Sequence, residues 1–92
     1  MAEGRRVMEP VTLDFRAERP VYWLIVVHDQ NGKVAQTRWA WERHNTPAEA
    51  TQDAYGIEPS PGMKCYPLHH TLRESRKMAN RIAQGLDWGR LR

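Results

Sequence analysis

The sequence has very little cysteine. Cys65 is the only one among 92 residues. A single thiol cannot form an intramolecular disulfide, and it cannot supply a cysteine-rich zinc module. The count therefore excludes a disulfide-stabilised scaffold and favours a reducing compartment, so we expect a cytoplasmic protein.

Long hydrophobic runs are also missing. The longest apolar stretch, Val21 to Val27, has seven residues, whereas a helix that spans a bilayer needs about 20. The first ten residues carry two glutamates and two arginines and have no apolar run behind them, which is not the pattern of a signal peptide. We therefore expect no membrane association.

What the sequence does contain is enough apolar area for one modest core. Hydrophobic residues make up 40% of the chain and include four tryptophans and three tyrosines. A length of 92 residues fits a single domain, because two separate cores would each be marginal. We predict a flexible N-terminal tail over residues 1–10 and a single α+β domain over residues 11–92.

Three stretches have the character of β-strands before the middle of the chain. Residues 11–16 alternate apolar and polar side chains, which indicates a weak edge strand. Residues 21–28 are apolar on both alternating faces and rich in β-branched and aromatic side chains, which indicates the central strand. Asn31-Gly32 then predicts a hairpin with a type I′ turn, leading into a partner strand over residues 34–43.

Two helices are marked by their capping residues. Thr46, Pro47 and Glu49 begin a helix over residues 47–55 that stops at Gly56. A second capping box at Thr71 and Glu74 begins a helix over residues 72–84, and residues 63–68 between the helices could form an edge strand. The predicted fold is a small antiparallel sheet of three or four strands, with hairpin 21–43 at its centre and both helices on one face.

The tryptophans of the second hairpin strand allow two interpretations. Trp39 and Trp41 share one strand face, where they could fill the core beneath a helix. They could also form an exposed aromatic surface for a partner or a base, since Arg38, Arg43 and Tyr22 lie nearby. The core interpretation is favoured, and Trp88 is the best candidate for an exposed tryptophan.

The side chains that could bind a metal or act in catalysis do not form a recognisable site. Cys65, His69 and His70 lack zinc-family spacing, and adjacent histidines of a strand would point to opposite faces, so we assign no metal. No cofactor motif is present. Cys65 has no evident orienting residues for nucleophilic catalysis, so no catalytic residue is assigned. The weakest alternative is a small hydrolase or nuclease that uses His28 with Asp29 or Asp14.

Positive charge is concentrated at the C-terminal end. Residues 71–92 hold six lysines or arginines against two acids, while residues 1–70 hold eight against nine. The predicted last helix places most of these cations opposite a thin apolar stripe that includes Leu72 and Ile82. A solvated helix surface would show some of this charge, but the excess of arginine predicts a binding face. The predicted partner-binding residues are Arg73, Arg76, Lys77, Arg81, Trp88, Arg90 and Arg92.

The charge and the missing catalytic constellation together favour a non-enzymatic interaction protein. Such a protein would bind the acidic surface of a protein or nucleoprotein complex through its C-terminal helix. An adaptor, or an inhibitor of the kind made by mobile elements, would show these features. The alternative is direct nucleic-acid binding, in which the same cations contact phosphates. The sequence leaves the partner and the oligomeric state open.

Overall fold

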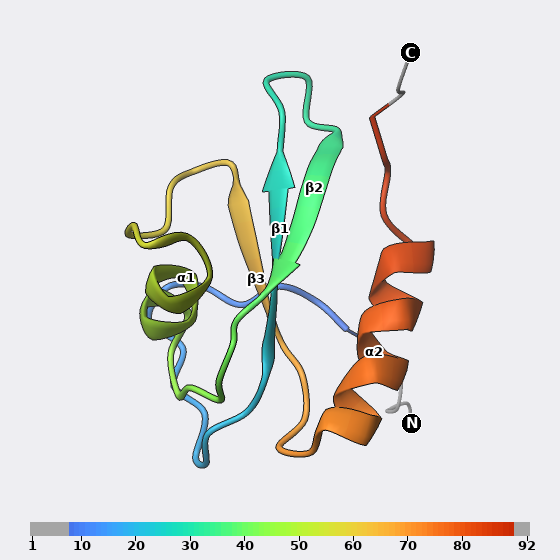
Figure 1. Ribbon diagram of the computed structural model, residues 1–92. Helices are drawn as coiled ribbons and strands as arrows, with labels where there is room; N and C mark the ends of the chain where they lie inside the picture. The colour runs from blue at the N-terminus through green and yellow to red at the C-terminus, as the bar shows by residue number, and fades with distance from the viewer. Residues whose placement is uncertain (1–7, 90–92) are drawn as a thin grey trace.

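The computed structural model describes residues 8–89, which form a three-stranded antiparallel sheet with two helices (Figure 1). The elements in chain order are β1 (Trp23–His28), β2 (Val34–Trp39), α1 (Pro47–Tyr55), β3 (Met63–Pro67) and α2 (Leu72–Gln84). The strand order is β2-β1-β3, so β1 lies at the centre as its two apolar faces predict. The predicted α+β fold is confirmed.

The β1–β2 hairpin forms where it is predicted, but its turn is different. A type I′ turn needs positive φ at two consecutive residues, and only Gly32 has it, at 80°. The side chain of Asp29 instead accepts hydrogen bonds from the backbone N–H groups of Asn31 and Lys33. The loop is therefore closed by an aspartate that caps its own turn, with the glycine alone in the left-handed region.

Both helices have the predicted bounds because their caps form as predicted. The hydroxyl of Thr46 accepts from the Glu49 N–H, and Gly56 ends α1 in the left-handed region at φ 75°. The hydroxyl of Thr71 accepts from the Glu74 N–H at the start of α2. These side chains satisfy backbone groups that the first turn of a helix leaves without partners.

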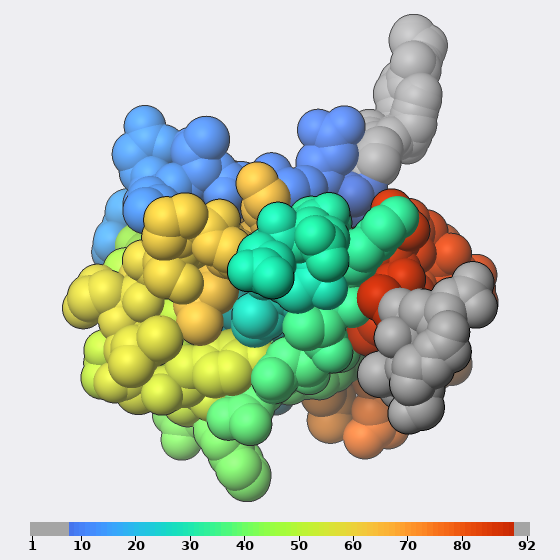
Figure 2. Space-filling view, turned by 90° about the horizontal axis from the view of Figure 1, so that it is seen from above, coloured from blue at the N-terminus to red at the C-terminus, as the bar shows by residue number. Residues whose placement is uncertain are grey.

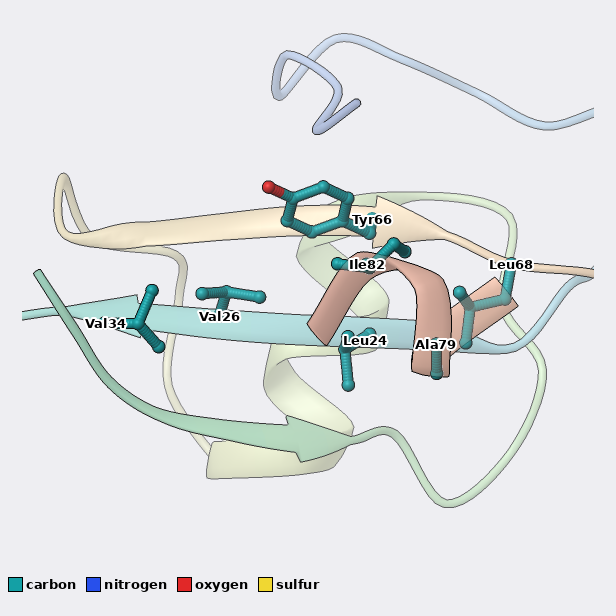
Figure 3. Close-up of a cluster of buried hydrophobic side chains, with 7 residues drawn as sticks. All are labelled: Leu24, Val26, Val34, Tyr66, Leu68, Ala79 and Ile82. Atoms are coloured by element: carbon teal, nitrogen blue, oxygen red, sulfur yellow. The ribbon is translucent and has the colours of Figure 1, made fainter. Parts of the chain in front are cut away.

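The prediction that both helices cover one face of the sheet is wrong. Helix α1 packs on one face and α2 on the other, as Figures 1 and 2 show from two directions. The physical reason is β1, which has apolar residues on both faces, and each face has to be removed from water. The α1-side cluster consists of Trp23, Ile25, Ala40, Ala50, Ala54 and Cys65. The α2-side cluster consists of Leu24, Val26, Val34, Tyr66, Leu68, Ala79 and Ile82 (Figure 3).

Strand β2 is shorter than predicted, and this separates its two tryptophans. The strand ends at Trp39, which is half-buried and packs against the α2-side cluster. Trp41 lies beyond the strand and is 82% exposed. The pairing with β1 also shifts between Val27 and His28, so Val34 joins the same cluster as Trp39 although strict alternation would separate them. A bulge of this kind adds one residue to a strand and reverses the facing of those beyond it.

Both outer strands have short additional pairings. Val11 pairs with Cys65 of β3, which is all that remains of the predicted strand over residues 11–16, since the chain turns back from Thr12 to Phe15. Trp88 pairs with Val34 at the start of β2. Of the predicted tail, residues 1–7 lie outside the described part, and Met8 packs against the α2-side cluster. Within residues 8–89, no helix is long and apolar enough to cross a membrane.

Candidate interaction surface

The outer side of α2 is a continuous exposed surface of basic residues. Its inner side buries only Ser75, Ala79 and Ile82. Three- and four-residue spacing then places the cations on the opposite side, where they are exposed to solvent. We call this surface the basic face; it comprises Arg73, Arg76, Lys77 and Arg81.

The acids near the basic face are bound to lysines rather than to arginines. Glu74 lies 3.6 Å from Nζ of Lys77. Asp87 accepts from Nζ of Lys33 at 2.8 Å. Among residues 8–89, no carboxylate lies within 4.0 Å of the guanidinium groups of Arg73, Arg76 or Arg81. No described acid therefore occupies the hydrogen-bond donors of these three guanidinium groups.

A buried serine holds the start of α2 in place. The hydroxyl of Ser75 donates to the carbonyl oxygen of His69 at 2.9 Å and accepts from the His69 N–H at 3.0 Å. Nδ1 of His69 in turn accepts from the backbone N–H of Thr71 at 3.1 Å. The loop that precedes α2 is thus tied to the helix by side chains, and this fixes the position of the first basic residues.

Aromatic and cationic side chains extend the surface beyond the N-terminus of α2. Arg43 donates to the carbonyl oxygen of His70 at 3.2 Å, and its guanidinium lies 6.0 Å from the centre of the Tyr22 ring. Tyr22 makes an edge-to-face contact with Trp39. Trp41 lines a shallow hollow with Tyr22 and Arg43. The favoured core interpretation is therefore wrong for Trp41, which is exposed beside Tyr22 and Arg43. Arg38 lies elsewhere, since its guanidinium donates to the Ala54 carbonyl oxygen of α1.

The two adjacent histidines do not point to opposite faces as expected. They follow the end of β3, and their rings stack with centres 4.2 Å apart. Partial burial lowers the pKa of His70, and the positive charges of Arg19, His69 and Arg43 lower it further. The sequence did not predict that Arg19 and Arg43 lie near His70, because both are distant from it in the chain.

A groove runs between α2 and β2. It has a volume of about 440 Å³ and is lined by Trp39, Leu72, Arg76, Ala79 and Asn80. Leu72 was expected on the buried stripe of α2, but it is 42% exposed at the rim of this groove. The surface therefore combines exposed arginines with accessible apolar area, the residue classes that dominate protein interfaces.

Comparison with protein-family models, with curated proteins and with solved structures finds no match.

Of the remaining predicted binding residues, Trp88 lies in the described part of the chain. Trp88 is 46% exposed, and its indole N–H donates to the carbonyl oxygen of Ala83 near the end of α2. It is therefore held between the last turn of α2 and the start of β2. Arg90 and Arg92 lie outside the described residues.

The weakest enzymatic alternative has little geometric support in the described part of the chain. Nδ1 of His28 is 3.2 Å from the carbonyl oxygen of Gly62. Asp29 caps its turn and Asp14 bonds to Thr12, so neither carboxylate orients His28. Cys65 is buried beside Thr51, and burial raises the pKa of its thiol against the opposing effect of the Thr51 hydroxyl. Residues 8–89 hold no cluster of three or more metal-ligating side chains.

Proposed function

We propose that this protein is a non-enzymatic interaction protein that binds an acidic protein or nucleoprotein surface through the basic face of α2. The observation that carries the proposal is the set of arginines Arg73, Arg76 and Arg81, which are exposed and have no carboxylate partner among residues 8–89. An adaptor or an inhibitor would use such a surface.

The chemistry of arginine explains the choice of partner. Its planar guanidinium matches a carboxylate through two parallel hydrogen bonds, and this gives orientation as well as energy. Opposite charges also speed the encounter and exclude partners of the same sign. Trp41 and Leu72 would supply the apolar contact that charge alone does not provide.

The experiment compares two charge-reversal variants in affinity capture from the native host. The first, Arg73→Glu with Lys77→Glu, reverses two charges of the basic face. The second, Arg16→Glu with Lys64→Glu, changes the net charge equally at exposed positions outside α2. The proposal expects the first variant to lose the partner and the second to retain it, with unchanged circular dichroism in both. Equal capture by both variants would contradict it.

Direct nucleic-acid binding is the second candidate, favoured by Trp41 beside Arg43. An exposed indole next to a guanidinium can stack on a base while the cation contacts a phosphate. The isoelectric point of about 9.4 agrees with this candidate. Fluorescence anisotropy with a labelled single-stranded oligonucleotide at two salt concentrations tests it. Binding that weakens steeply with salt would support phosphate contact, and no binding at low salt would remove this candidate.

A further inference from the structure

Among the described residues, the outer edge of β2 is bonded only at its first residue. Strand β2 is an edge strand whose other side pairs with β1. In the part of the chain that the structure describes, only Val34 has backbone bonds on the outer side. Its N–H donates to the Asp87 carbonyl oxygen, and its own carbonyl oxygen accepts from the Gly89 N–H. Beyond Val34, no backbone bond from any other part of residues 8–89 reaches this edge. Residues 87–89 therefore close one end of the edge, and no other described residue bonds to the rest of it.

The register identifies which groups point outward. Ala40 donates its N–H to the carbonyl oxygen of Trp23 on β1. Because antiparallel pairs alternate along a ladder, Arg38 also faces β1, and the N–H and C=O groups of Thr37 and Trp39 face away from it. Outward groups that have no partner among residues 8–89 are a template for an added strand.

The groove between α2 and β2 lies directly beside this edge. Trp39 belongs to both, since its backbone faces outward and its side chain lines the groove with Leu72 and Arg76. In Figure 3, α2 lies over β1, with β2 to one side of it.

We propose that an extended acidic segment of the partner adds to the outer edge of β2 as a fourth strand, with alternate side chains in the groove. Apolar side chains of the segment contact Trp39 and Leu72, and a carboxylate pairs with Arg76. Backbone hydrogen bonds give affinity in this mode, and the side chains that enter the groove give specificity. The inference rests on the proposed function, because it names the form in which the acidic partner binds.

Charge favours an acidic segment over a second copy of this chain. If two copies paired through antiparallel β2 edges, their sheets would be continuous and both α2 helices would lie on the same face. Arg76 of each copy would then approach the basic face of the other, and like charges oppose this arrangement. An acidic strand meets the same arginine with attraction.

The test uses a fluorescein-labelled alternating peptide of the repeat Val-Ser-Glu-Ser, which places valine and glutamate in turn on one face of an extended strand, with a block-ordered peptide of the same composition as its control. Thr37→Pro removes the outward N–H without breaking the ladder to β1, since edge strands tolerate proline where the N–H faces solvent. Thr37→Val keeps the N–H and is the matched control. We expect Thr37→Pro to weaken peptide binding by about tenfold and Thr37→Val to leave it unchanged.

Amide hydrogen exchange on the unaltered protein provides a test that needs no variant. Adding the alternating peptide should slow exchange at Thr37 and Trp39, whereas the block-ordered peptide should not. Absence of binding by the alternating peptide, or binding without protection at these two amides, would overturn the inference. If Thr37→Pro still captures the native partner while Arg73→Glu with Lys77→Glu does not, the proposed function stands and the strand addition fails.

Discussion

Nε2 of His44 lies 2.7 Å from Oδ2 of Asp53, and this pair joins the loop after β2 to helix α1. The same carboxylate oxygen accepts from the backbone N–H of Glu42 at 3.0 Å. Burial raises the pKa of Asp53, but the hydrogen bonds from His44 and Glu42 outweigh it, so the pKa lies below its ordinary value of 3.8. The pair thus fixes the segment that presents Trp41.

Because the pKa of Asp53 is lower in the folded state, its contribution to stability is present above pH 3.8 and is lost as the pH falls through the lowered value. Urea unfolding at neutral and acid pH should show this loss. Asp53→Asn should cost about 1–3 kcal/mol at neutral pH, from the lost charge-assisted bonds, and should reduce the acid-dependent loss. The control Glu58→Gln, at an exposed position, should behave like the original chain at every pH.

The tryptophans should differ sharply in their effect on stability. Trp23 is fully buried, and its indole N–H donates to the His44 carbonyl oxygen at 2.8 Å. Trp23→Phe should destabilise the fold by about 1–3 kcal/mol, because that carbonyl loses a partner and the ring leaves a gap. Trp41→Phe should change the free energy of unfolding by less than about 0.5 kcal/mol. Equal effects in urea unfolding would contradict the assignment of Trp41 to the surface.

Replacement of Ser75 should lower the stability of the fold more than the small size of its side chain suggests. Ser75→Ala removes both hydrogen bonds to the backbone of His69 and should cost about 1–2 kcal/mol. Amide exchange in the first turn of α2 should become faster in this variant. Ser60→Ala, at an exposed loop position, is the control and should leave exchange in α2 unchanged.

The thiol of Cys65 should react slowly in the folded protein. It is 2% exposed, and burial, opposed by the Thr51 hydroxyl, raises its pKa from 9.0. The reactive thiolate is therefore scarce at neutral pH. Labelling with a chromogenic disulfide reagent should be slow in buffer and fast in denaturing urea. Rapid labelling without urea would mean that the α1-side cluster opens readily.

Local signals made the elements predictable from the sequence. Thr46 and Thr71 define the two helix starts through interactions a few residues long, and the apolar run of β1 identifies the central strand. The same run also indicated that the two helices lie on opposite faces of the sheet, because a strand that is apolar on both faces has to be covered on both. The bulge near Val34 could not be read from alternation, since it depends on how two strands align.

The candidate surface was only partly predictable for the same reason. The spacing of Arg73 and Lys77 along one helix is a local property, so the basic face followed from the sequence. The approach of Arg43 to His70, and the groove beside Trp39, depend on contacts between segments distant in the chain. The exposure of Trp41 followed from the end of β2 at Trp39, for which the sequence has no strong stop signal.

The most direct measurement is the affinity of the captured partner for the purified protein, titrated at low and moderate salt. We predict that Arg73→Glu with Lys77→Glu weakens binding by at least about tenfold and reduces its salt dependence. Arg16→Glu with Lys64→Glu should change affinity much less. Equal affinity of both variants, with the fold intact, would contradict the basic face of α2 as the binding surface.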